Sequence, residues 1–260
     1  MTIVVNKEQF LDTYRNYKLG LRSFEKYRYL FPIFTSPTLA RVIADITSDG
    51  HLGERMIQFI SKNKEEVIDF KERIFKLFKF KGRLRHSPSN PKMWECIVLN
   101  GPICRILKLC GAPMGNKVLK RFGIPKWIIK DSNEIKANYI RGLFDGEGSI
   151  ISNFKNRNRI RIMINLHKEE KLVNNLEKFL NQIRLMLKSL GIKTTNLYYT
   201  GKTARKDGKI TLGRGFEIQG TKNNLSSILN FRNYINFGVN RKAQILNDGI
   251  EYLMSIASAG

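Results

Sequence analysis

The 260-residue chain holds 46 Lys plus Arg against 22 Asp plus Glu, a formal net charge of +24. Such a charge indicates a polyanionic partner, either nucleic acid or an anionic membrane surface, although general basicity as in ribosomal or thermophile proteins gives the same composition. No apolar run approaches the roughly 20 residues of a spanning helix, and the N-terminus lacks the basic start and apolar stretch of a signal peptide. We therefore expect a soluble, intracellular protein, in a prokaryotic cytoplasm or an organelle matrix.

The three cysteines are spaced irregularly. Cys96, Cys104 and Cys110 form no CxxC pair, and the three histidines are scattered along the chain. This pattern supports neither a structural zinc site nor a disulfide framework. We expect all three to act as small buried apolar residues.

The predicted elements begin with a helical extension over residues 1–38, which is rich in Tyr, Phe and Arg. A first half follows over residues 39–125. Its first helix has Ser36 as the expected N-cap and Pro37 at the first helical position, a strong start signal. A second half covers residues 126–260, and its first helix is expected to open at Asp131 with Glu134 as a capping-box partner.

The chain contains one internal repeat, which organises the two halves. The segment VIADITSDGHL, residues 42–52, resembles IRGLFDGEGSI, residues 140–150. Asp49 matches Glu147, which lies 98 residues later, and Gly50 matches Gly148. The second copy carries six more residues between the acid and the following helix. Each half is predicted to run helix, hairpin, helix, hairpin, helix, an α+β arrangement.

Apolar spacing after each acid supports this order. Residues 63–78 and 167–187 have helical spacing of their apolar residues, and strand-like segments occupy residues 158–165 and 215–220. The halves are expected to meet near residues 115–130, where Gly, Pro and basic residues interrupt the pattern.

Small residues line one face of each motif helix. Ala44 with Ser48, and Gly142 with Gly146, recur at a spacing of four and share a face, so two such helices can approach closely. Asp49 and Glu147 would then lie at matching ends of a helix pair. Carboxylates are hard ligands suited to Mg²⁺, and metal ions can activate water for phosphodiester hydrolysis.

Both segments resemble the LAGLIDADG motif of homing endonucleases. The second copy, IRGLFDGEG, is close to the family pattern, whereas the first, VIADITSDG, is degenerate but keeps the small residues, the final acid and the glycine. The segment IPKWIIKDSNEIKANYIRGLFDGEGSI also resembles archaeal and organellar members. The resemblance covers most of residues 36–256.

The resemblance implies a double-motif, single-chain protein of the archaeal intron-encoded type. Its fold would be a pseudo-dimer of two αββαββα halves whose sheets form a saddle over DNA, with the motif helices packed at the interface. Its activity would be site-specific, metal-dependent cleavage of both DNA strands across the minor groove. Asp49 and Glu147 would be both the catalytic residues and the metal ligands. Mg²⁺ or Mn²⁺ would support cleavage, and Ca²⁺ would bind without supporting it. The enzyme would act as a monomer on double-stranded DNA and serve intron homing.

Other roles for the acids remain possible at this stage. A lone Asp49 would be interpreted as a helix-terminal acid that caps or binds an arginine, and its match with Glu147 favours the metal role instead. Asp145 corresponds to Thr47 in the first copy. Because it has no matching acid, we expect a helix-end hydrogen-bonding residue rather than a metal ligand.

Candidate DNA-binding residues are richest in the second half. Arg157, Arg159 and Arg161 alternate with Asn158, Ile160 and Ile162, so period two places the three guanidinium groups on one sheet face. That face would lie in the major groove and contact guanine edges or phosphates. Further candidates flank hairpin turns, with Asp207-Gly208 as one turn tip: Lys155, Lys202, Arg205, Lys206, Lys209 and Arg214.

The first half has a shorter first hairpin and fewer candidates, so we expect asymmetric contacts. The DNA-binding candidates there are Arg55, Gln58, Arg83 and Arg85, with Lys62 beside them. The family resemblance also implies basic or amide side chains near the scissile phosphates. By their position after the last strand of each half, Asn100 and Lys222 are the candidates.

Three alternatives compete with the nuclease. An RNA-binding intron maturase of the same fold is the main one, and the retention of both acids favours the nuclease over it. A nuclease domain of an intein is the second, but the chain begins with Met and does not end in His-Asn, which favours a free-standing enzyme. A purely structural basic protein does not explain the repeat.

Overall fold

The computed structural model describes residues 2–153 and 158–258. The chain forms two compact units. Unit 1 comprises residues 1–116 and 125–139, and unit 2 comprises residues 117–124 and 140–260. The sequence had suggested a boundary after residue 125. The division of the folded chain instead passes through the second motif helix, after Tyr139.

The N-terminal extension contains helices, as expected, and also two short paired strands. Its elements are β1 (Ile3–Val5), α1 (Lys7–Leu11), α2 (Tyr17–Tyr27), a 3₁₀ turn (Arg28–Leu30) and β2 (Ile33–Phe34). Its aromatic residues form a small core in which the ring centroids of Phe10 and Phe31 lie 5.0 Å apart. The guanidinium of Arg105, from the helix that ends the first repeat, donates to the backbone oxygen of Thr13. Within unit 1, the extension therefore packs on the first repeat.

The first repeat has the expected order of elements. These are α3 (Pro37–Thr47), β3 (Gly50–Leu52), β4 (Met56–Ser61), α4 (Lys64–Phe78), β5 (Arg83–Ser87), β6 (Asn90–Leu99) and α5 (Gly101–Leu109). The four strands form an antiparallel sheet in the order β3-β4-β6-β5. Helix α4 covers one face of this sheet, where the ring of Phe70 stacks on that of Phe59 at 4.8 Å.

The second repeat has the same order with longer strands. Its elements are α7 (Asn133–Gly146), β7 (Gly148–Asn153), β8 (Arg159–Glu169), α8 (Val173–Ser189), β9 (Tyr198–Ala204), β10 (Ile210–Thr221), α9 (Ser226–Asn230) and α10 (Asn240–Ser258). The sheet order β7-β8-β10-β9 corresponds strand for strand to that of unit 1. Both units therefore have the predicted α+β repeat.

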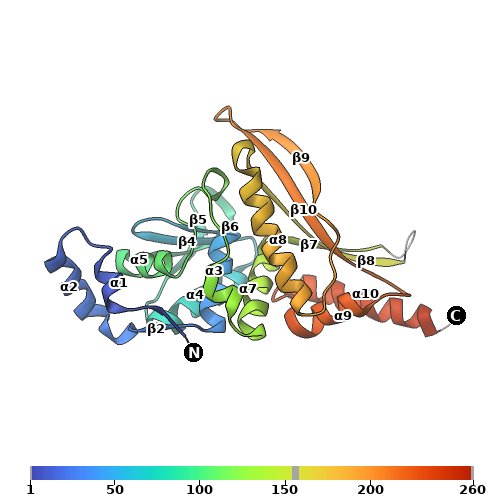
Figure 1. Cartoon of the computed structure of the whole chain (residues 1–260), viewed down its shortest axis with the longest axis horizontal. Coiled ribbons are helices and arrows are strands. Elements are labelled where there is room, and N and C mark those ends of the chain that lie inside the picture. The colour runs from blue at the N-terminus through green and yellow to red at the C-terminus, as the bar shows by residue number, and fades with distance from the viewer. Residues whose placement is uncertain (1, 154–157, 259–260) are drawn as a thin grey trace. The chain divides into compact units, whose positions relative to one another are not determined.

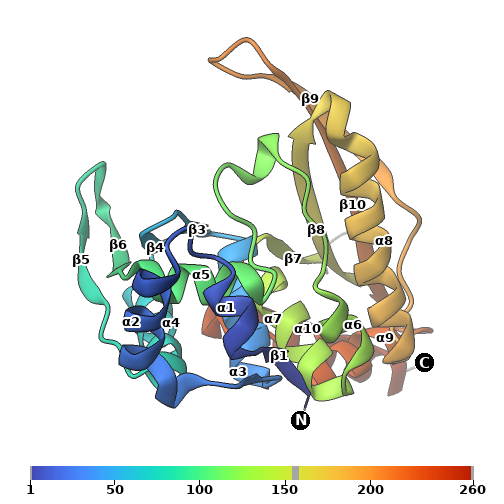
Figure 2. The ribbon, with the colours of Figure 1, turned by 60° about the vertical axis from the view of Figure 1, so that its left-hand side comes forward.

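Helix α8 lies along one face of the second sheet (Figure 1). Alternate residues of β8, namely Ile160, Ile162 and Ile164, are fully buried, as are Phe216 and Ile218 of β10. Figure 2 shows the β9–β10 hairpin extending past the N-terminal end of α8. The predicted turn at its tip is confirmed, because Gly208 has a left-handed φ of 77°.

The segment before α7 is shared between the two units. Residues 117–124 belong to unit 2, where Asn175 of α8 binds both backbone groups of Phe122, at 3.2 Å and 2.9 Å. Helix α6 (Lys126–Lys130) belongs to unit 1, where the indole N–H of Trp127 donates to the Cys110 oxygen.

The three cysteines are buried and unpaired, as the sequence predicted. Burial raises the pKa of Cys96 to about 11 and that of Cys104 to about 12. These thiols are therefore protonated at neutral pH and pack as apolar groups. Within residues 2–153 and 158–258, no helix is both long and apolar enough to cross a bilayer.

Candidate active site

The first motif helix, α3, begins and ends as its sequence dictates. The Ser36 hydroxyl accepts from the Leu39 N–H at 3.1 Å, so it caps the helix start as predicted. At the other end, the Thr47 hydroxyl donates to the Ile43 carbonyl at 2.7 Å, and Ser48 ends the helix. The chain then leaves the helix through Asp49, whose side chain is exposed.

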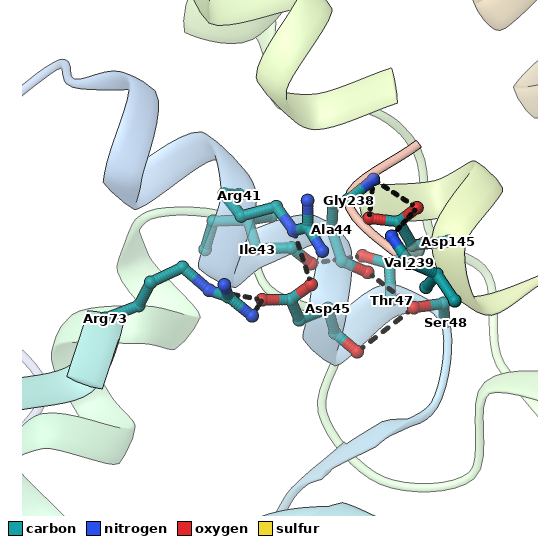
Figure 3. Close-up of polar contacts among 10 residues, drawn as sticks. All are labelled: Arg41, Ile43, Ala44, Asp45, Thr47, Ser48, Arg73, Asp145, Gly238 and Val239. Atoms are coloured by element: carbon teal, nitrogen blue, oxygen red, sulfur yellow. Dashed lines mark hydrogen bonds and ion pairs between the residues drawn. The ribbon is translucent and has the colours of Figure 1, made fainter. Parts of the chain in front are cut away.

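A buried acid inside α3 anchors this helix to α4. Asp45 accepts from Arg41, one turn earlier, at 2.8 Å. Its second oxygen accepts from two nitrogens of Arg73 on α4, at 3.0 Å and 3.1 Å (Figure 3). Only 3% of the Asp45 side chain is exposed, so both cations compensate a charge that is removed from water. Asp45 therefore has a structural role.

The glycine after each motif acid is required by a close approach of the backbone. A Cβ on Gly50 would lie 2.8 Å from the Cα of Ile46. A Cβ on Gly148 would collide with the backbone of Phe144. In both repeats the strand therefore passes directly against the last turn of its motif helix. This passage fixes where each acid leaves the helix.

The second motif helix, α7, begins one residue later than predicted. The Ser132 hydroxyl accepts from the Ile135 N–H, so Ser132 caps the helix in place of Asp131. Asp131 instead ends α6 and accepts from the Ser132 N–H at 2.7 Å. At the far end, the Glu147 N–H donates to the Leu143 carbonyl at 2.9 Å, which continues the helical pattern up to the half-buried acid.

Asp145 has the hydrogen-bonding role that the sequence suggested. Its carboxylate accepts from the backbone N–H of Gly238, at 2.9 Å and 3.1 Å, and from that of Val239 at 3.4 Å (Figure 3). Both donors precede the first residue of α10. Asp145 therefore ties the end of α7 to the beginning of α10.

The end of α7 also receives a buried lysine. Lys242 of α10 is 9% exposed, and its ammonium donates to the backbone oxygens of Phe144, Asp145 and Gly148 at 3.1, 2.6 and 2.6 Å. A cation at a helix C-terminus satisfies carbonyls that lack intrahelical partners and interacts favourably with the helix dipole. Lys242 therefore fixes the backbone on both sides of Glu147.

The donor chemistry of the two motif acids fits a hard divalent cation. Each is a carboxylate at the end of a motif helix, exposed at Asp49 and half-buried at Glu147. Carboxylate, water and phosphate oxygens are the ligands that Mg²⁺ prefers. Within the described ranges, no group of three or more His, Cys, Asp and Glu could hold a metal by itself. A cation would therefore need oxygens from water or substrate as well.

The small residues predicted to line the motif helices lie where expected within each helix. Ala44 and Ser48 are buried in α3, and Gly142 is buried in α7, where Gly146 is half-buried. Ser48 also donates to the Ala44 carbonyl at 3.1 Å. The packing of one small-residue face against the other remains a prediction.

The second sheet has the alternation predicted for its arginines. Arg159 and Arg161 lie on the face of β8 opposite α8, since the intervening isoleucines face that helix. Arg157 and Lys155 lie outside the described residues. Arg205 and Lys209 flank the hairpin tip, where Arg205 pairs with Asp207 at 3.1 Å.

Arg214 occupies the opposite face from the one expected for a DNA contact. It pairs across the sheet with Leu166, on the side covered by α8. Its guanidinium donates to Glu177 of α8 at 2.7 Å and lies 5.5 Å from the centroid of the Tyr199 ring. Alternation with Phe216 and Ile218 explains this placement. Arg214 is therefore not part of the arginine face.

In unit 1, three DNA-binding candidates share one sheet face. Gln58 and Arg83 both pair with Ile97, and Arg85 pairs with Glu95. Paired residues share a face, so all three candidates lie on the sheet face that α4 does not cover. Arg55 lies in the exposed turn between β3 and β4. This face lines a hollow bounded by apolar residues, one lysine and the two arginines: Met56, Phe80, Lys81, Arg83, Arg85, Ile97 and Leu99.

The two residues expected near scissile phosphates differ in their surroundings. Asn100 directly follows β6 but is 7% exposed. Its amide donates to the Tyr27 hydroxyl at 2.7 Å and accepts from the Ile103 N–H at 3.0 Å, which makes it the N-cap of α5. This geometry gives Asn100 a structural role. Lys222 follows β10 in an exposed turn, and its contact with a phosphate stays a prediction.

Comparison with known families identifies the second repeat. Residues 134–236 match the family model described as LAGLIDADG-like domain. These matched residues are therefore similar to LAGLIDADG domains. The matched segment runs from the motif helix α7 through the second sheet to the turn after α9, so the family match covers the repeat with the less degenerate motif.

The chain is also similar to parts of curated proteins. The chain is 29% identical over 191 residues to the tRNA-splicing ligase RtcB of Pyrococcus furiosus, covering 66% of this chain and 20% of that protein. It is 26% identical over 190 residues to the ribonucleoside-diphosphate reductase NrdEB subunit alpha of Bacillus subtilis, covering 66% and 16%. The chain thus spans about a fifth of the length of these relatives.

Among solved structures, the chain is similar to mesophilic variants of the homing endonuclease I-DmoI. The identity is 15%, the match covers 82% of this chain and 97% of that chain, and the TM-score is 0.49.

Sequence reasoning missed the groups that support the motif helices and the sheet faces. The sequence did not indicate the ion pair of Asp45 with Arg73 or the role of Lys242. It also did not indicate two buried glutamates, Glu95 and Glu217. The strand periodicity around Glu95 and Glu217 could have placed both acids on the arginine faces. No local pattern indicates the contact of Lys242 with Gly148, because 94 residues separate them.

Proposed function

We propose that this chain is a site-specific endonuclease that binds double-stranded DNA and hydrolyses a phosphodiester in each strand across the minor groove, as a monomer. The observation that carries the proposal is the matched pair of helix ends. Each motif acid precedes a glycine that packs directly against the last helical turn, in a chain with a net charge of +24. A structural basic protein needs no such repeated arrangement.

In this proposal Asp49 and Glu147 hold the divalent metal and are the catalytic acids. When bound, Mg²⁺ or Mn²⁺ supplies Lewis-acid stabilisation of a developing oxyanion and lowers the pKa of a water molecule. The chain contributes orientation. Gly50 and Gly148 fix the backbone beside each acid, and Lys242 holds the carbonyls that flank Glu147.

The remaining basic residues would bind the duplex. Arg159 and Arg161 on the second sheet, and Arg83 and Arg85 on the first, lie on faces without a covering helix of the same repeat. Arg55, Arg205, Lys209 and Lys222 would contact phosphates from the turns. A polyelectrolyte interface of this kind releases counterions, so the affinity should fall steeply as salt rises.

The proposed function is tested by incubating the protein with a randomised duplex library in Mg²⁺ and sequencing the cleaved ends. The expected result is a set of related sequences cut in both strands, with cleavage absent in Ca²⁺. Binding of duplexes without any cleavage in Mg²⁺ or Mn²⁺ would contradict the nuclease. Selective binding of structured RNA over duplex DNA would favour the maturase.

A second hypothesis concerns the context of the same domain. A single segment matches parts of two proteins with unrelated names, a ligase and a reductase subunit, over a fifth of their lengths or less. A segment shared in this way does not account for either named activity, which favours a module able to reside within a longer protein, such as the nuclease domain of an intein. Coding sequence that continues on both sides of the gene segment would support this hypothesis.

A further inference from the structure

The sheet face opposite α4 in unit 1 contains a fully buried carboxylate. Glu95 of β6 is 0% exposed and accepts two side-chain hydrogen bonds. One comes from the Nε of Arg85 on β5 at 2.6 Å, and the other from the Nε2 of Gln58 on β4 at 2.6 Å. Glu95 therefore connects three strands through the two residues that were predicted to contact DNA.

The second sheet has the same chemistry on its own exposed face. Glu217 of β10 is 7% exposed and accepts from the Nε of Arg161 on β8 and from the Nε2 of Gln219. When the two repeats are aligned at Gly50 and Gly148, the strand pairings place Ile97 at the position of Glu217. Glu95 lies two residues before Ile97 and is therefore not the equivalent of Glu217. The two clusters therefore have the same composition at positions that the repeat does not equate.

A contribution to folding stability does not by itself explain these clusters of a buried acid with an arginine and a glutamine. Burying a carboxylate costs free energy, and a buried ion pair is often no more stabilising than well-packed apolar residues. Both arginines also keep part of their side chains in solvent, 44% for Arg85 and 29% for Arg161. In each cluster the carboxylate is buried and part of the arginine side chain is exposed to solvent. The buried carboxylate therefore orients the exposed part of the guanidinium.

The hydrogen bonds determine which groups remain available. Because Nε of Arg85 and of Arg161 is taken by a carboxylate, the terminal Nη pair of each guanidinium can donate outward. Guanine presents two acceptors, O6 and N7, at the spacing of such a pair. A carboxylate only accepts, so the nitrogen of Gln58 and of Gln219 must face it, and the amide oxygen is fixed in orientation.

We propose that Glu95 and Glu217 are positioning residues for base recognition. They orient Arg85 and Arg161 to bind guanine edges in the major groove, and they orient Gln58 and Gln219 toward a neighbouring base. This inference rests on the proposed DNA-binding function, and it adds two acids and one amide to the residues that determine sequence specificity. A carboxylate on a DNA-facing surface repels the phosphates and so lowers nonspecific affinity. The two acids therefore do not serve to strengthen phosphate binding, unlike the basic residues in the turns.

The test selects bound duplexes from a randomised library in Ca²⁺, so that binding is measured without cleavage. Arg85→Ala identifies the base pair that depends on Arg85. Glu95→Gln should lose the guanine preference at that same base pair by about tenfold, the value of one good bidentate contact. Its affinity for non-cognate duplex and its salt dependence should stay unchanged or rise slightly.

Matched controls separate positioning from folding. Glu177→Gln removes the acid that pairs with Arg214 on the covered face, and it should leave every base preference unchanged. Adding Glu95→Gln to Arg85→Ala should change the preference no further. If Glu95→Gln does not fold by circular dichroism, Arg85→Lys keeps the ion pair but removes the guanidinium fork, and the pair Glu217→Gln and Arg161→Ala repeats the test in unit 2.

A folded Glu95→Gln variant with the wild-type base preferences would overturn the inference. So would a wild-type protein that binds duplex DNA with no base preference at all, although DNA binding itself would then stand. A wild-type protein that neither binds nor cleaves duplex DNA would instead overturn the proposed function on which the inference rests.

Discussion

The two repeats end their motif helices in the same way but support them with different groups. In unit 1 the helix is held from its side by Asp45, which binds Arg41 and Arg73. In unit 2 the position of Asp45 is occupied by Leu143, and the helix end is held instead by Lys242 and through Asp145. The acid and the glycine are thus shared, while the surrounding network is not. This difference indicates that the geometry of the helix end is the feature common to both repeats.

The sheets differ in a parallel way. The first hairpin of unit 1 has a three-residue strand, β3, and its exposed face carries aliphatic residues beside Arg83 and Arg85. In unit 2 the equivalent strand β7 has six residues and its partner β8 has eleven, and Gly213 and Gly215 leave room beside His167 and Asn165. The longer, more polar face supports the expectation of asymmetric DNA contacts.

The largest expected effect concerns the network specific to unit 1. Asp45→Asn removes a buried charge that compensates two arginines, so we expect a loss of about 3 kcal/mol in the free energy of unfolding, measured by urea titration. Glu25→Gln, which breaks an exposed ion pair with Arg28, should change stability by less than about 0.5 kcal/mol. Similar values for the two variants would show that Asp45 does not anchor α3.

The shared glycines provide the next comparison. Gly50→Ala and Gly148→Ala should each destabilise by about 2 kcal/mol, because the new Cβ meets backbone atoms of the preceding helix. The loss should be greater for Gly148, where the contact is closer. Thermal unfolding of both variants measures the difference. An alanine tolerated at both positions would contradict the close helix-end passage.

A pH-dependent effect on stability, no larger than that of the glycine substitutions, is expected in unit 2. Burial lowers the pKa of Lys168 from 10.5 to about 8, while its ammonium lies 3.6 Å from the centroid of the Phe122 ring. Because the unfolded chain keeps this proton up to a higher pH, the contribution of Lys168 to stability should rise as pH increases from 8 to 10.5. The gain in the free energy of unfolding over this pH range should be on the order of 2 kcal/mol. The cation–π contact with Phe122 stabilises the charged lysine and so offsets part of the free-energy cost of its burial.

The variant Lys168→Met tests this pH effect. It should be more stable than the wild type at pH 7, and the difference should shrink toward pH 10.5. Urea titrations at several pH values measure both quantities. A difference that is independent of pH would show that the lysine does not titrate in this range.

Local patterns predicted much of the architecture. Ser36 and Pro37 located the first motif helix, the matched acids located both helix ends, and alternation placed Arg159 and Arg161 on one face. Patterns failed where a contact joins distant segments or where a neighbouring residue competes. Arg73 reaches Asp45 across 28 residues. Ser132 replaces Asp131 as the cap, since the Ser132 hydroxyl accepts from the Ile135 N–H while the Asp131 carboxylate accepts from the Ser132 N–H. Asn100 illustrates a third cause of failed prediction. The position directly after β6 suggested a phosphate contact, but the same position is the N-cap of α5.

The central claim is that Asp49 and Glu147 form the catalytic pair. The direct measurement compares wild type, Asp49→Asn, Glu147→Gln and Glu25→Gln on a cognate duplex obtained by selection, with cleavage assayed in Mg²⁺ and affinity in Ca²⁺. Each motif variant should lose double-strand cleavage while its affinity stays within about tenfold, because no base contact is removed. Glu25→Gln should cleave as the wild type does. Full double-strand cleavage by either motif variant would contradict the assignment.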